Sequence, residues 1–170
     1  KPYNTWYANG KTTMPRASDY HIMFPMRWDL TTDRFSFHLA VSPDNVIWSH
    51  VPGGAVCEPG DRNGWDAGVV APGHGMVELP GDRIGILFTG TPVPHKYPRQ
   101  PPFGAAAWAY WTKGRLVALQ APEEGSFALH PLLFDGRKVL LNVRTAMTGY
   151  VQVEAVGVDG NTLPGRTFDD

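Results

Sequence analysis

Glycine and proline interrupt this chain so often that long helices are excluded from the start. The 170 residues include 19 glycines and 16 prolines, and no stretch of about ten residues shows convincing helical periodicity. Glycine and proline suit tight turns and weaken helices, so this composition is typical of many short strands joined by turns. The sequence therefore predicts an all-β fold.

The clearest strand pattern begins at Phe35. Residues 35–41 alternate between apolar and polar side chains, as expected of a strand with one buried face, and His38 lies on the more polar face. The next residues predict a hairpin, because Asp44-Asn45 readily takes the positive φ angles of a tight turn. Trp48 is then expected to pack back across the two strands.

Other segments are assigned from apolar runs and turn residues. Residues 21–28 form a continuous apolar run that predicts a buried strand, in which Pro25 implies a bulge or an edge position. Residues 1–20 are predicted to be an irregular lead-in. Three successive strands are predicted further on, with a turn over residues 72–75 between the first two: 69–71, 76–79 and 84–89.

The predicted organisation has two parts. A proline-rich loop over residues 91–104 lies within the first part and is long enough to be a substrate-rim loop or a surface excursion. A polar break follows Pro122, and a domain boundary is expected near residue 121. Residues 1–121 are then one region and residues 122–170 another. In the second region strands are predicted over residues 127–134, 138–143 and 150–158, with a hairpin turn at Asp135-Gly136 and a turn over residues 159–161, as in part of a β-sandwich.

Charge and residue composition exclude several classes of partner and cofactor. The net charge of -1 and pI near 6.6 provide no basic surface for nucleic acid or for an anionic membrane. No apolar run is long enough to span a membrane. Cys57 is the single cysteine, so an internal disulfide is impossible and the compartment stays open. The histidines lack the paired spacing of a zinc site, and no cofactor motif occurs.

The strongest candidate site is the motif Asn63-Gly-Trp-Asp-Ala-Gly68, which precedes an apolar run. A carboxylate flanked by an aromatic residue and glycines at the start of a strand can be directed into a cleft, which makes Asp66 a candidate catalytic residue. The alternative is a turn aspartate that caps its own backbone. Trp65 is the first candidate for a substrate contact.

Four other side chains are candidate substrate contacts. Tyr7 and Asn9 offer stacking and hydrogen bonds, or pack in a surface loop. Arg27 is costly to bury unpaired, so it is either an ion-pair partner or a ligand contact. His74, between glycines, either reaches a cleft or faces water.

A resemblance gives these residues a common function. The chain resembles bacterial proteins similar to the five-bladed-propeller glycoside hydrolases related to families 32 and 43. The motifs that carry the resemblance are His21-Ile-Met-Phe-Pro25, Leu39-Ala-Val-Ser-Pro-Asp-Asn-Val-Ile-Trp48, Gly64-Trp-Asp-Ala-Gly68, Leu87-Phe-Thr-Gly90, Leu140-Leu-Asn-Val143, Gly149-Tyr-Val-Gln-Val-Glu154 and Asp159-Gly160 to Leu163-Pro-Gly165.

The resemblance implies a partial β-propeller of about two blades followed by a partial β-sandwich. It also implies a glycoside hydrolase-like protein, or a fragment of one, that acts by carboxylate acid/base chemistry. Asp66 then fixes the substrate or stabilises the transition state. Glu58, next to Cys57, is similar in reversed order to the Glu-Cys pair that supplies the acid in family 32 enzymes.

Two alternatives stay open beside hydrolysis. One is a non-catalytic carbohydrate-binding or assembly module, since aromatic side chains stack on sugars without any acid pair. The other is a structural remnant without an independent function. Carbohydrate is the expected partner, and self-association through unpaired strand edges is also expected.

Overall fold

The computed structural model describes residues 3–97, 104–133, 136 and 138–169. The chain divides into two compact units, Lys1–Leu119 and Gln120–Asp170. The described residues form strands and no helix, which confirms the all-β prediction. The strands all lie in the first unit: β1 (Asn4–Met14), β2 (Ala17–Asp29), β3 (Arg34–Phe37), β4 (Ala40–Ser42), β5 (Ser49–His50), β6 (Val69–Leu79), β7 (Arg83–Thr91) and β8 (Ala105–Thr112).

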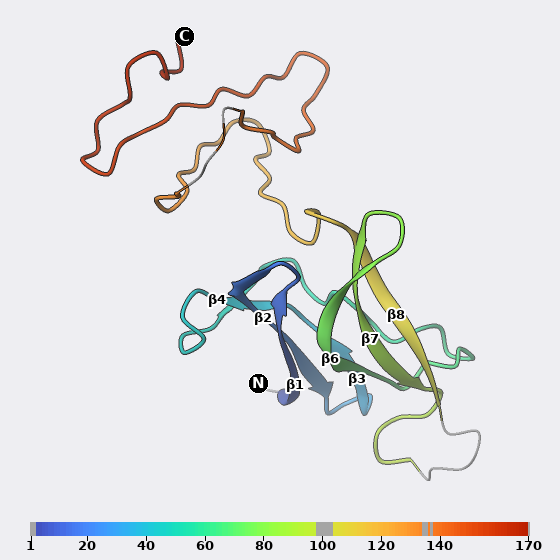
Figure 1. Cartoon of the computed structure of the whole chain (residues 1–170). Coiled ribbons are helices and arrows are strands. Elements are labelled where there is room, and N and C mark those ends of the chain that lie inside the picture. The colour runs from blue at the N-terminus through green and yellow to red at the C-terminus, as the bar shows by residue number, and fades with distance from the viewer. Residues whose placement is uncertain (1–2, 98–103, 134–135, 137, 170) are drawn as a thin grey trace. The chain divides into compact units, whose positions relative to one another are not determined.

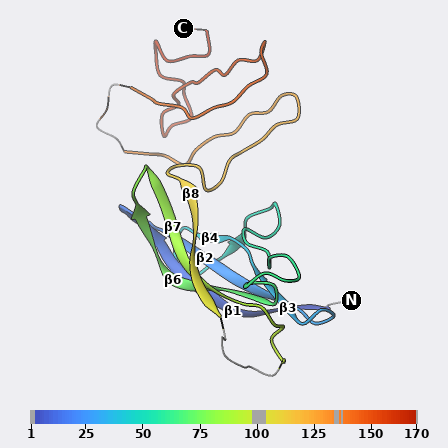
Figure 2. The same ribbon diagram turned by 90° about the vertical axis from the view of Figure 1, so that its right-hand side faces the viewer.

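These strands form one open, mixed sheet that is organised around β2 (Figure 1). β1 runs antiparallel along β2, while β4 pairs with the first half of β2 and β3 with the second half. The order continues from β3 through β6 and β7 to β8. The pairing of β3 with β6 is parallel, through Phe35 and Val69. Figure 2 shows β8 as a long curved strand next to β7.

The prediction of an irregular lead-in over residues 1–20 is wrong, because β1 occupies most of it. β1 and β2 form a hairpin that closes at Pro15-Arg16, where Pro15 suits the first central turn position and Arg16 adopts a φ of 63°. Most side chains in the first half of β1 are exposed. No buried apolar face therefore marks this strand in the sequence, because it is held by its partner.

Pro25 explains why the strand predicted over residues 35–41 divides into β3 and β4. It lies in the middle of β2, where it has no N–H to donate to a neighbouring strand. The neighbour changes there from β4 to β3, and the Pro25 carbonyl accepts a hydrogen bond of 2.9 Å from the backbone N–H of His38. The strand is thus interrupted on the side facing Pro25.

The turn predicted over residues 72–75 is a bulge inside β6 instead. The pairing of β6 with β7 slips between Pro72 and Met76. The backbone N–H of Met76 donates to the Thr12 hydroxyl oxygen of β1, at 2.8 Å. β1 approaches β6 closely here, because Gly10 has no side chain to collide with the Gly73 carbonyl.

The core of the first unit lies on one face of β2. Phe24 of β2, Phe37 of β3 and Ile86 of β7 have no exposed surface, and the Phe24 and Phe37 rings pack edge to face with centroids 5.9 Å apart. Burying side chains of this size contributes about 1.5–3 kcal/mol each. Met23 and Pro25 alternate with these core positions along β2, so their side chains belong to the opposite face.

The second unit contains no strand among its described residues. The described residues of the strands predicted over residues 127–134, 138–143 and 150–158 form no strand. Phe134, the end of the first of these, and Asp135, part of a predicted hairpin turn, lie outside the described residues. Apolar side chains such as Leu140, at 90% exposed, have no interior to enter. Isolated strands are unstable without a paired neighbour and a covered apolar face.

One predicted turn of the second unit is present. A bridge between Val156 and Thr162 closes it, and the Gly157 N–H donates to the Asn161 carbonyl at 2.8 Å. The Asp159 carboxylate accepts from the Asn161 backbone N–H and side-chain amide. These hydrogen bonds hold the carboxylate charged, so the pKa of Asp159 is lowered.

Candidate functional site

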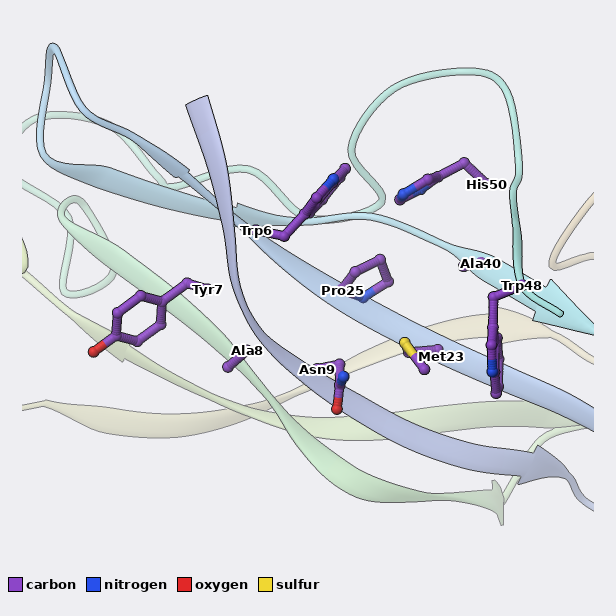
Figure 3. A pocket seen from close by; sticks show the side chains of 9 residues that line it. All are labelled: Trp6, Tyr7, Ala8, Asn9, Met23, Pro25, Ala40, Trp48 and His50. Carbon is purple, nitrogen blue, oxygen red and sulfur yellow. The ribbon is translucent and has the colours of Figure 1, made fainter. Parts of the chain in front are cut away.

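A hollow of about 310 Å³ lies on the face of β2 that is turned away from the core. Its lining comes from β1, β2, β4 and β5 and from Trp48, which directly precedes β5 (Figure 3). The lining includes two indole rings, one phenol ring and one imidazole. The lining residues are Trp6, Tyr7, Ala8, Asn9, Met23, Pro25, Ala40, Trp48 and His50.

Ring contacts around Trp6 form one side of this hollow. The Trp6 indole stacks on the His50 imidazole, with centroids 4.4 Å apart, and meets the His38 ring edge to face at 5.4 Å. Trp6 remains 51% exposed. It therefore keeps apolar ring surface available to a ligand while its position is fixed by two imidazoles.

Trp48 and His50 are positioned by the turn that was predicted as a hairpin. The Asp44 carboxylate accepts hydrogen bonds from the backbone N–H groups of Val46 and Ile47, at 2.9 and 2.8 Å, and from the Ser42 hydroxyl at 3.0 Å. The backbone donors lower the pKa of Asp44, because they stabilise its charged form. This turn brings β5 back onto β4 and carries Trp48 to the hollow.

Tyr7 and Asn9, both predicted substrate contacts, line the hollow in different ways. Figure 3 shows the Tyr7 ring directed away from Trp6 and Trp48. That ring packs edge to face against Trp28, Phe35 and His95, with centroids 5.0–5.9 Å apart. A register shift between Trp6 and Ala8 turns Tyr7 to this side. Asn9 thus offers a side-chain amide to the hollow, whereas Tyr7 contributes little of its ring.

Three polar side chains lie next to one another on this face of the sheet. Arg27 of β2 pairs in register with Trp6 on one side and with Ser36 on the other. Ser36 and His38 are both buried, and the serine hydroxyl lies 3.3 Å from His38 Nε2. Burial lowers the pKa of His38, and the positive charge of Arg27 lowers it further, so the imidazole is held neutral.

Asp66, the predicted catalytic residue, lies elsewhere, in the turn before β6. Trp65 packs against Phe88 of the core with ring centroids 5.7 Å apart, and both Trp65 and Asp66 press on Gly90 of β7. The Asp66 carboxylate lies against Gly60 and forms no hydrogen bond among the described residues. It therefore does not cap its own backbone, and neither it nor Trp65 lines the hollow.

Glu58, the second predicted catalytic residue, is exposed and adjoins the only cysteine. Burial raises the pKa of the Cys57 thiol to about 11, and the negative charges of Asp66 and Glu58 raise it as well. Both candidate carboxylates therefore act on one thiol. The structure thus relates Asp66 to Glu58 through their shared effect on the pKa of Cys57.

His74 is exposed in the bulge of β6 and does not line the hollow. Of the nine lining residues, only Tyr7 and Asn9 were predicted from the sequence, and the missed ones include Trp6, Trp48 and His50. Trp6 stood in the supposed lead-in, and its role depends on pairing with β2 and contact with β5. The sequence cue that was available is Trp48, which follows the hairpin predicted at Asp44-Asn45.

The fold and the hollow define an all-β protein with one open mixed sheet and an aromatic-lined hollow on the face away from its core. No protein-family model, no curated protein and no solved structure matches the chain. Within the described ranges, no helix is long and apolar enough to cross a membrane. Over those same residues, no three His, Cys, Asp or Glu side chains are grouped to hold a metal ion.

Proposed function

We propose that this protein binds carbohydrate in the hollow between Trp6 and Trp48. The observation that carries the proposal is the presence of exposed indole surface and a side-chain amide, that of Asn9, around one cavity. Sugar rings present apolar C–H faces that pack on aromatic rings and hydroxyls that need hydrogen-bond partners. A volume of about 310 Å³ is at the lower end for ligand sites and suits a short glycan.

The matched tryptophans of this chain provide the test. NMR titration with a panel of neutral and acidic mono- and oligosaccharides is expected to shift resonances of Trp48 and Asn9. Trp48→Ala should weaken binding about tenfold or more, as loss of a central aromatic contact does. Trp65→Ala, outside the hollow, is the control and should leave affinity unchanged. Binding lost only in Trp65→Ala would move the site to the Asp66 turn.

A second candidate is hydrolysis of a glycosidic bond, as the family resemblance implies. The supporting observation is that Asp66 and Glu58 both influence the thiol of Cys57. Glycosidases need two carboxyl groups roughly 5–10 Å apart on either side of the bond. Turnover of a glycan that disappears in Asp66→Asn and in Glu58→Gln would support this candidate. Sugar binding without turnover in the wild type would exclude hydrolysis and retain carbohydrate binding as the function.

The larger architecture also belongs to this proposal. The antiparallel run β6–β7–β8 supports a propeller blade, which is a small antiparallel sheet. A β-sandwich in residues 122–170 requires strands that the described residues do not form in this structure, and it would protect the backbone amides of those strands from hydrogen exchange. Exchange of that region at the rate of an unfolded chain would contradict the sandwich.

A further inference from the structure

The position of Arg27 points to the kind of sugar that the hollow takes. Arg27 follows Met23 and Pro25 at alternate positions of β2, so all three side chains share the face that carries the hollow. Its register partner on β1 is Trp6, a lining residue. Arg27 is not itself a lining residue, but this register places it at the edge of the hollow, beside Trp6.

The Arg27 side chain forms no ion pair and no hydrogen bond among the described residues. Its Nε atom is buried without a hydrogen bond, and both recorded ion pairs involve Glu78. A buried donor on a charged group that lacks a partner costs free energy comparable to a lost charge-assisted hydrogen bond. Arg27 as a whole is only half-buried, so a ligand can reach the side chain.

The charged groups nearby do not neutralise Arg27. Hydrogen bonds from the backbone N–H groups of Thr31 and Thr32 lower the pKa of Asp29, and the charge of Arg27 lowers it further, but the two side chains form no ion pair. Glu58 acts on His38 from a distance but lies beyond ion-pair range of Arg27. His38 is buried and can donate or accept a hydrogen bond without adding a second charge. The positive charge at this edge of the hollow is thus left for an incoming anion.

We propose that the hollow binds an acidic sugar, a hexuronate, whose carboxylate pairs with Arg27 while its ring packs between Trp6 and Trp48. A guanidinium presents two parallel N–H donors that match the two oxygens of a carboxylate. This inference rests on carbohydrate binding in the hollow and adds the class of sugar.

The test compares a sugar with its own neutral ester. Glucuronate and its methyl ester have the same ring and hydroxyls, and only glucuronate carries the charged carboxylate. The wild type is expected to bind glucuronate about tenfold or more tightly than the ester, as one charge-assisted pair supplies. This comparison uses the unmodified protein, so it does not depend on how well any variant folds.

Variants then assign the preference to Arg27. Arg27→Gln should bind the acid and the ester equally, while Arg83→Gln, at a half-buried arginine of β7 that contacts Tyr110, should retain the preference. Equal binding of acid and ester by the wild type would overturn this inference and leave carbohydrate binding intact. Binding of neither sugar would overturn both. Equal binding of glucose 6-sulfate and glucuronate would overturn the assignment of the carboxylate.

Discussion

The Trp6 indole lies on the His50 imidazole, with ring centroids 4.4 Å apart and ring planes 20° from parallel. The two residues come from β1 and β5, which pair with β2 and β4 and not with each other. Their contact therefore spans two intervening strands on the face away from the core. The side of the hollow that it forms depends on the twist of the sheet as much as on the two rings.

His38 is expected to make the protein less stable in mild acid. Its folded pKa is lowered by burial and by Arg27, so the unfolded chain binds a proton first as the pH falls. The contribution to the free energy of unfolding is complete above the unfolded pKa of about 6.5 and is lost as the pH falls toward the folded pKa. One group can produce a slope of at most about 1.4 kcal/mol per pH unit.

Urea unfolding between about pH 5 and pH 8 measures this slope. His38→Gln should flatten it, and His130→Gln, at an exposed position of the second unit, should not. A wild-type slope that persists in His38→Gln would assign the acid sensitivity to another group.

Asp44 is expected to control the hollow through the turn that carries Trp48. Asp44→Ala removes the acceptor of the Val46 and Ile47 N–H groups, so the turn loosens and Trp48 samples more positions. Sugar affinity should fall several-fold, because a less ordered site must be ordered on binding. Asp159→Ala breaks a similar turn in the second unit and is the control. Unchanged affinity in Asp44→Ala would show that the turn does not position the tryptophan.

Local patterns predicted the strand type but not what covers each face. The alternation over residues 35–41 correctly placed Phe35, Phe37 and Leu39 in the interior. It did not predict that Ser36 and His38 on the other face are also buried. The residues that follow β5 return to β3, where Phe37 and Cys57 exchange backbone hydrogen bonds. Burial of this second face depends on segments that are distant in sequence, so the alternation over residues 35–41 does not predict it.

The candidate site was predicted in part for a similar reason. Asn9 was chosen for its hydrogen-bonding side chain and does line the hollow. Asp66 was chosen for its neighbours Gly64 and Gly68, but Gly68 is needed because the backbone carbonyl of Val93 lies where a side chain would stand. A glycine that permits close packing and one that frees a catalytic carboxylate look the same in sequence.

Gly90→Ala is expected to displace the Asp66 turn. A Cβ at Gly90 would lie 2.6 Å from the Trp65 ring and 2.7 Å from the Asp66 Cβ, so one side must move. Such overpacking costs about 1–3 kcal/mol, measurable by urea unfolding. Ala106→Ser, on the exposed side of β8, should change stability by less than about 0.5 kcal/mol. A Gly90→Ala protein as stable as the wild type would show that the turn yields freely.

β8 is expected to mediate self-association, because it pairs only with β7 among the described strands. An unpaired edge offers free backbone groups to another chain, and a lysine on such an edge discourages pairing. Trp108 of β8 is 44% exposed. Sedimentation should show a concentration-dependent dimer for the wild type and a weaker dimer for Trp108→Lys, whereas Tyr150→Lys, on the second unit, serves as the control. A wild type that stays monomeric at high concentration would contradict the expectation.

Cys57 is expected to react slowly with alkylating reagents. A thiol pKa of about 11 leaves far less thiolate at pH 8 than an ordinary cysteine has, by a factor of roughly a few hundred. Asp66→Asn and Glu58→Gln should each speed alkylation by iodoacetamide, because each removes a negative charge that opposes the thiolate. Burial is the larger cause of the raised pKa, so these increases should be smaller than the increase on unfolding.

The matched control for these two variants is Glu124→Gln, an exposed carboxylate of the second unit, which should leave the rate unchanged. If Asp66→Asn accelerates alkylation and Glu58→Gln does not, only Asp66 acts on the thiol. The two carboxylates would then lack their shared neighbour, and hydrolysis by this pair would lose its supporting observation. Acceleration in both variants would place both charges close enough to Cys57 to serve one site.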